Sequence, residues 1–188
     1  YLTVDQLHDA HHHTAPVTLI RIEQPGAEPL LWEPFAAGGD DDPAVECKGP
    51  TKLGPILADM ANMPDAAMTL AAVACFAEGT SILRGLGTLR HKETDRLAAM
   101  KNELTKVGVA VKTSVAGDED AITITPPPGG VDCSAGCKRV EFETYDDHRM
   151  AMSLSLIGLR RPNVWIKNPA CVNKTYPGFW GDLAKVYG

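Results

Sequence analysis

Three short segments concentrate side chains that could bind an anion. Arg90 to Arg96 reads RHKETDR, Asp146 to Arg149 reads DDHR, and Asn173 to Pro177 reads NKTYP. An arginine can bind a flat carboxylate or a phosphate through two parallel N–H bonds, whereas a lysine offers a point charge. The residue types therefore suit a carboxylate or phosphate ligand.

The cations in these segments fall near the expected starts of helices. They are Lys92, Arg96, Arg149 and Lys174. A helix N-terminus carries a partial positive charge, so cations are unfavourable there unless an anion is present. On a helix that starts near Glu93, Arg96 lies about one turn further along, so both side chains could face one ligand. Ordinary surface ion pairs, worth under ~1 kcal/mol each, would produce a similar pattern, and the spacing leaves both interpretations open.

The spacing of hydrophobic residues, together with the glycines and prolines that end helices, predicts the elements that position these residues. Asp65 to Phe76, after Pro64, is typical of a helix, and Glu93 to Val107 is an amphipathic helix that Gly108 ends. The expected strands are Ser81 to Arg84 and a hairpin of Val109 to Thr113 with Ala121 to Thr125.

An internal repeat relates two parts of the chain. A gapless shift of 82 positions sets Asp65 on Asp147, Met68 on Met150 and Lys92 on Lys174. In the same register Ile82 and Leu83 fall on Val164 and Trp165, and Leu97 falls on Phe179. The repeated unit predicted in this way is a helix, a strand, a loop that ends in lysine, and a second helix.

Composition restricts the class of protein. The chain has 188 residues, 44% hydrophobic and 22% charged, which favours one globular domain. Its net charge of -6 argues against nucleic acid and anionic membrane as partners. We expect a cytoplasmic protein, because there is no apolar run of about 18 residues and no leader pattern. The chain starts at Tyr1 rather than Met, so we expect that it is part of a longer one.

Cysteine and histidine usage gives no sign of a metal site or a disulfide framework. The five cysteines, scattered from Cys47 to Cys171, are expected to be free thiols. The run His11 to His13 lacks partners at ligand spacing, and the three aspartates within Ala36 to Pro43 suit a solvated loop. Before that loop, Val4 to His11 suggests a short helix and Val17 to Ile22 a strand.

Four segments, in this order, resemble the C-terminal half of EPSP synthases. They are PDAAMT (Pro64 to Thr69), RHKETDRL (Arg90 to Leu97), TYDDHRMAM (Thr144 to Met152) and KTYP (Lys174 to Pro177). The resemblance extends from about Asp59 to the end of the chain, and residues 1–45 are included because they are contiguous with it.

The resemblance implies a fold and an activity. The fold would be an α/β domain of repeated βαβαββ units with buried helices and outer sheets, one of the family's two domains, spanning residues 1–188. The family's reaction moves the enolpyruvyl group of phosphoenolpyruvate to the 5-hydroxyl of shikimate 3-phosphate and releases phosphate. It is a step of the shikimate pathway and the target of glyphosate. No metal or organic cofactor is expected.

The resemblance also implies roles for individual residues. Asp65 would accept the proton of the 5-hydroxyl or orient that group, and Glu93 would handle the proton on the methylene carbon of phosphoenolpyruvate. Lys92 would contact shikimate 3-phosphate. The residues expected to bind phosphoenolpyruvate are Arg96, Arg149 and Lys174, with His148 alongside.

Two alternatives accompany this hypothesis. The family's other domain carries a catalytic lysine and most of the shikimate 3-phosphate site, so this chain is expected to be inactive alone and to need an N-terminal domain as partner. One alternative is a non-catalytic anion-binding module on the same scaffold. The other is a related enolpyruvyl transferase of cell-wall synthesis, against which the RHKETDR and DDHRMAM segments argue.

Overall fold

The computed structural model describes residues 34–35, 44–45 and 52–187. The helix expected at Val4 to His11, the strand at Val17 to Ile22 and the loop at Ala36 to Pro43 lie outside these residues, as do His11 to His13 and Cys47. Two short antiparallel strands, β1 (Pro34–Phe35) and β2 (Ala44–Val45), come before the main body of the domain.

The first structural unit builds a four-stranded sheet with two helices. Its elements are β3 (Leu57–Asp59), η1 (Pro64–Ala66), α2 (Ala67–Ala74), β4 (Ser81–Arg84), η2 (Gly87–His91), α3 (Arg96–Thr105), β5 (Ala110–Lys112) and β6 (Ile122–Thr125). The sheet order is β3-β4-β6-β5, with β3 parallel to β4 and the other pairs antiparallel. The expected strand and hairpin are confirmed.

The second unit repeats the order of the first. It contains β7 (Val140–Phe142), α4 (His148–Ser155), η3 (Leu156–Leu159), β8 (Val164–Ile166), η4 (Pro169–Lys174) and α5 (Phe179–Tyr187). The strands β7 and β8 are parallel, as β3 and β4 are. The repeat predicted from the 82-residue shift is therefore confirmed, because strand, helix, strand, 3₁₀ turn and helix recur in that order.

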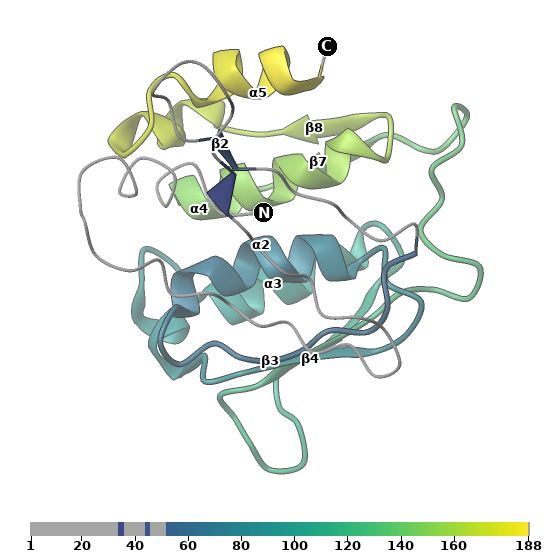
Figure 1. The fold of residues 1–188 in the computed structure, drawn as a ribbon, viewed down its shortest axis with the longest axis vertical. Helices are drawn as coiled ribbons and strands as arrows, with labels where there is room; N and C mark the ends of the chain where they lie inside the picture. Colours follow the sequence, from purple (N-terminus) through teal and green to yellow (C-terminus); the bar gives the residue numbers. More distant parts are fainter. Residues whose placement is uncertain (1–33, 36–43, 46–51, 188) are drawn as a thin grey trace.

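The layers place helices between sheets. In Figure 1 the sheet that contains β3 and β4 lies at the bottom, α2 and α3 lie above it, then α4, and β7 and β8 lie above α4. The prediction of an α/β fold with buried helices and outer sheets is confirmed by this arrangement. Both units share a single apolar cluster, to which β7 contributes Phe142 and α4 contributes Met150 and Leu154.

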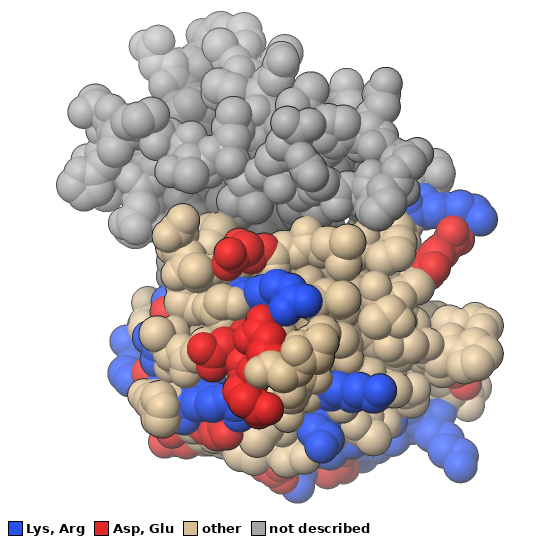
Figure 2. Space-filling view, turned by 90° about the horizontal axis from the view of Figure 1, so that it is seen from below, with Lys and Arg blue, Asp and Glu red and all other residues tan. Residues whose placement is uncertain are grey.

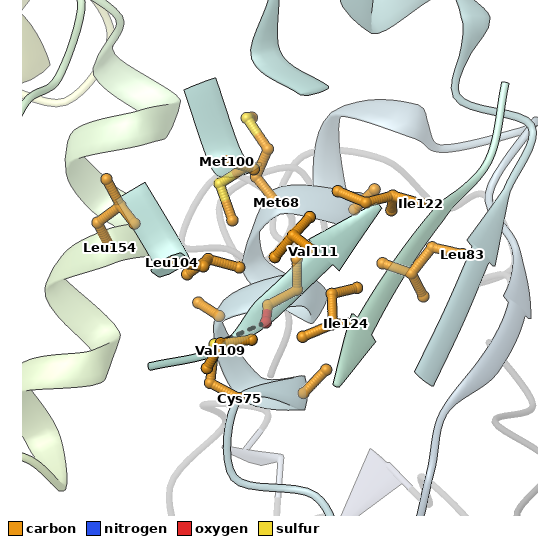
Figure 3. Close-up of a cluster of buried hydrophobic side chains, with 14 of the residues drawn as sticks. Met68, Cys75, Leu83, Met100, Leu104, Val109, Val111, Ile122, Ile124 and Leu154 are labelled. Atoms are coloured by element: carbon orange, nitrogen blue, oxygen red, sulfur yellow. Dashed lines mark hydrogen bonds between the residues drawn. The ribbon is translucent and has the colours of Figure 1, made fainter. Parts of the chain in front are cut away.

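The centre of the core fills the space between α2, α3 and the sheet (Figure 3). Leu83, Ile122 and Ile124 come from the strands, and Met68 and Leu104 from the helices, each at most 2% exposed. Cys75 is buried at the end of α2, and burial raises the pKa of its thiol to about 12. The four cysteines among the described residues are free thiols, as expected.

The helix expected at Glu93 to Val107 is shorter than predicted. The α3 helix begins at Arg96, because Asp95 occupies the N-cap: its Oδ1 accepts hydrogen bonds from the backbone N–H groups of Leu97 (3.1 Å) and Ala98 (3.0 Å). Glu93 therefore lies before the helix and not in its first turn. The helix expected from Asp65 opens as the 3₁₀ turn η1 and continues as α2.

The Asp95→Ala variant should lower the free energy of unfolding by about 1 kcal/mol, because two N–H groups of α3 lose their acceptor. Urea denaturation would measure the change. Asp95→Asn, which keeps a capping oxygen, should lose much less, and Asp132→Ala, which removes a similar bond to the N–H of Ser134 in an exposed loop, is the control. Equal losses in all three variants would rule out capping as the cause.

Candidate functional site

The predicted site residues meet around the guanidinium group of Arg96, whose side chain is 2% exposed. Its Nε and Nη2 donate to the two carboxylate oxygens of Asp147, at 2.7 and 3.2 Å. Its Nη1 donates to Asp65 Oδ1 at 2.7 Å, and Nη2 also donates to Glu93 Oε2 at 2.9 Å. One buried cation therefore holds three carboxylates from three segments of the chain.

Both repeat units contribute to this charged cluster. Arg96 opens α3, Asp65 lies in η1 just before α2, and Asp147 is the N-cap of α4. The Asp147 side chain also accepts from the backbone N–H groups of Arg149 (2.9 Å) and Met150 (3.4 Å). The starts of α2, α3 and α4 thus lie together around Arg96.

Three further cations lie around the carboxylates and are more exposed than Arg96. Lys92 Nζ and Arg149 Nε are each 3.7 Å from a carboxylate oxygen of Asp65, and Lys174 Nζ is 2.9 Å from Glu93 Oε1. Their side chains are 35%, 26% and 62% exposed, respectively. Four cations face three carboxylates, so the cluster carries one net positive charge when the neighbouring histidine is neutral.

Glu93 is ionised in this arrangement. Its hydrogen bond to Lys174, with further help from backbone hydrogen bonding and the charge of Arg96, lowers the pKa of its carboxyl from 4.5 to about 2. Glu93 is therefore a carboxylate near neutral pH, and its contact with Lys174 opposes protonation.

His148, the first residue of α4, is 4% exposed. Burial is the main cause that lowers the pKa of its imidazole, and the nearby Arg149 and Arg96 act in the same direction. Its Nδ1 is buried and has no hydrogen-bond partner among the described residues. The ring is therefore neutral near pH 7 and leaves a polar atom available to a ligand or water.

Most of this chain is similar to known proteins of one family. A family model described as EPSP synthase (3-phosphoshikimate 1-carboxyvinyltransferase) matches residues 36–183. This chain belongs to the EPSP synthase family. The curated 3-phosphoshikimate 1-carboxyvinyltransferase of Aliivibrio fischeri strain MJ11 is 44% identical over 146 residues, which is 78% of this chain and 31% of that protein.

Other EPSP synthases support the same assignment. The 3-phosphoshikimate 1-carboxyvinyltransferase of Klebsiella pneumoniae strain 342 is 48% identical over 128 residues, covering 68% of this chain and 27% of that protein. A solved EPSP synthase from Acinetobacter baumannii superposes with a TM-score of 0.64 at 30% identity, covering 85% of this chain and 36% of that one. The chain thus spans 31% or less of these two curated relatives. None of these three relatives is named as a cell-wall transferase.

Two positions differ from the sequence-based expectation. Lys92 and Lys174 do not lie at helix starts: Lys92 comes directly after the 3₁₀ turn η2, and Lys174 is the last residue of η4. Each lysine precedes a short connection to the next α-helix, and in the first unit the Asp95 cap sets where that helix begins. Of the four cations, Arg96 and Arg149 lie in the first turn of an α-helix. The protein's own carboxylates explain in part why these two cations are tolerated there.

Asp147 is a site residue that sequence reasoning missed. It is fully buried and supplies two of the oxygen contacts to Arg96. The sequence did contain a sign of its importance, since the 82-residue shift aligns Asp147 with Asp65, to which the resemblance gives a role. Asp147 is also the N-cap of α4.

On the face shown in Figure 2, acidic and basic side chains lie next to one another and form no broad area of one sign. A pocket of about 470 Å³ between η3, β8 and α5 is lined mainly by apolar residues and includes none of the charged cluster. Within the described part of the chain, no metal-holding group of three His, Cys, Asp or Glu side chains and no membrane-spanning helix is found.

The Lys174→Met variant should raise the pKa of Glu93 from about 2 toward 4.5, because the main contact that stabilises the carboxylate is removed. Carboxyl ¹³C shifts recorded through a pH titration would measure it. Lys167→Met is the matched control: it removes the ion pair with Glu143, so the pKa of Glu143 should rise while that of Glu93 stays the same. If Glu93 still titrates near 2 without Lys174, the stated cause is wrong.

Proposed function

We propose that this chain supplies one domain of a 3-phosphoshikimate 1-carboxyvinyltransferase. In this reaction the enolpyruvyl group of phosphoenolpyruvate moves to the 5-hydroxyl of shikimate 3-phosphate, and phosphate is released. The supporting observation is the charged cluster itself: Asp65 and Glu93 are held by one guanidinium beside three more accessible cations, in a chain of the EPSP synthase family.

The two carboxylates suit the proton transfers of this reaction. Addition of the 5-hydroxyl to the enol carbon forms a C–O bond while the hydroxyl proton leaves and the methylene carbon gains a proton. We assign the hydroxyl proton to Asp65 and the carbon proton to Glu93. Elimination of phosphate from the tetrahedral adduct then takes a proton back from the methyl group. Because both carboxylates contact Arg96, they lie close enough to act on one substrate pair.

The exposed cations suit the anionic groups of the two substrates. Arg149 and Lys174 are accessible beside the carboxylates, and we assign them to phosphoenolpyruvate, with His148 nearby. Lys92 is assigned to shikimate 3-phosphate. Arg96 was expected to bind phosphoenolpyruvate as well, but four of the five N–H groups of its guanidinium donate to carboxylates in this structure. A direct contact from Arg96 would use the remaining N–H of Nη1 or replace one of these four bonds.

Ligand binding would also prepare Glu93 for its role. Lys174 is the main cause of the low pKa of Glu93. An incoming phosphoenolpyruvate competes for that lysine, and weakening of the Lys174 contact raises the pKa of the carboxyl toward the range where it can hold a proton. The same lysine would thus bind the substrate and release Glu93 for proton transfer.

We assign residues 1–188 to a single domain, supported by the apolar cluster that both repeat units share. The chain spans 31% of the Aliivibrio fischeri relative, and the proposed partner is the N-terminal domain of such an enzyme. The absence of a cofactor and a cytoplasmic location stay predictions. A non-catalytic anion-binding module remains the second candidate, favoured by the one net positive charge that the cluster carries without any partner domain.

Phosphate release should occur only when the chain is complemented. The test compares this chain alone with a chimera in which it replaces the matching part of the Aliivibrio fischeri enzyme, both given phosphoenolpyruvate and shikimate 3-phosphate. Turnover by the chimera alone supports the proposal. Phosphoenolpyruvate binding without turnover in the folded chimera would favour the binding module, and turnover by this chain alone would overturn the need for a partner domain.

Glu93→Gln and Asp65→Ala, made in the chimera, should each lower kcat by about 10²-fold to 10⁴-fold, because each removes a proton-transfer group. The KM for phosphoenolpyruvate should change little, since the exposed cations remain. Arg139→Ala, which removes an exposed ion pair with Glu141, is the control and should behave as the parent. Parent-like kcat in either carboxylate variant would refute the role assigned to that residue.

A further inference from the structure

A second buried carboxylate lies on α3, outside the charged cluster. Glu103 is 1% exposed, and its Oε2 accepts hydrogen bonds from Lys106 Nζ (2.5 Å) and from the backbone N–H of Glu143 (2.9 Å). Its Oε1 accepts from the hydroxyl of Tyr145 at 2.8 Å. Two of the three donors therefore belong to the connection between β7 and α4.

This connection, residues 143–147, has an unfavourable backbone. Tyr145 and Asp146 both have φ of 56°, in the left-handed region that residues with a Cβ atom adopt rarely. Two such residues in succession persist only when surrounding contacts hold them. The hydrogen bonds from Glu143 and Tyr145 to Glu103 are contacts of this kind.

The connection is held at both ends by one helix. Arg96 binds Asp147 at its far end, and Glu103 binds Glu143 and Tyr145 at its near end. Residues seven apart share a face of an α-helix, so both anchors project from the same side of α3. Two separate side chains of α3 therefore anchor the connection that leads into α4.

The start of α4, directly after the connection, is part of the proposed site. Asp147 caps α4, His148 and Arg149 form its first turn, and Arg149 reaches the carboxylate of Asp65. A shift of residues 143–147 would move Arg149 relative to Asp65 and Glu93. The bonds of Glu103 thus affect the geometry of a ligand site that Glu103 does not touch.

We infer that Glu103 and Tyr145 are positioning residues that hold the connection before α4 so that Arg149 faces the anionic substrate. The inference rests on the proposed function for its effect on substrate, but the anchoring itself does not. Glu103 and Tyr145 act through Asp147 and Arg149 and make no contact with the reacting groups.

The test uses Tyr145→Phe in the chimera, because this change removes only a hydroxyl from a residue that is 37% exposed and should leave the fold intact. Ser114→Ala is the control, since it also removes a hydroxyl that donates to a carboxylate, that of Glu119, away from the charged cluster. Glu103→Gln, which keeps the shape but loses the charge, is the second variant.

We expect the KM for phosphoenolpyruvate to rise on the order of fivefold in Tyr145→Phe, the size expected when part of a charge-assisted hydrogen bond is lost. The kcat and the KM for shikimate 3-phosphate should stay within about twofold of the parent values. A general loss of stability would not separate the two substrates in this way. Hydrogen exchange at the Arg149 and Met150 amides, which bond to Asp147, should be faster by a similar factor.

Unchanged exchange at these amides in Tyr145→Phe overturns the anchoring. Faster exchange with an unchanged KM for phosphoenolpyruvate overturns the positioning role. The Ser114→Ala control should change neither quantity, and equal effects in Ser114→Ala and Tyr145→Phe also count against the inference. If the parent chimera shows no turnover, the proposed function fails, and the exchange measurement still decides whether Tyr145 anchors the connection.

Discussion

The charged cluster depends on the buried guanidinium group of Arg96 and the carboxylates that it contacts. A buried cation is strongly unfavourable unless it is paired and hydrogen-bonded, and Arg96 meets that requirement with Asp147, Asp65 and Glu93. The reverse also holds, because Asp147 is fully buried and would be an uncompensated charge without this partner. The requirement to pair both charges fixes α3 against the starts of α2 and α4, and so sets where the remaining site residues lie.

The repeat explains how such a cluster can form. In each unit the first strand is followed by a short segment that carries an aspartate, Asp65 or Asp147. The helix after this segment starts at the same end of the domain in both units. Packing α2 against α4 through a shared apolar core then brings Asp65 and Asp147 to one place. Arg96, which has no charged counterpart in the second unit because Gly178 occupies the matching position, joins the two copies.

Sequence patterns predicted an element correctly where interactions between neighbouring residues determine its structure. The short segment Ser81–Arg84 and the hairpin around Ala121 to Thr125 matched their predicted strands, since pleat and turn chemistry act over a few residues. The start of α3 was misplaced because Asp95, two residues after Glu93, supplies the capping oxygen. Thr94 and Asp95 both suit a cap by type, and only the backbone geometry selects one.

The sequence by itself determined the family, the repeat, the α/β architecture and the residue types of the site, because these follow from motif order, periodicity and side-chain chemistry. Tertiary structure decided how those charges pair. Arg96 is buried beneath three carboxylates, Lys174 holds Glu93 ionised, and Glu103 bonds to the connection before α4. Apart from the contact of Glu93 with Arg96, these contacts join residues 31 to 81 positions apart. Such contacts arise from packing of whole elements, which no local pattern encodes.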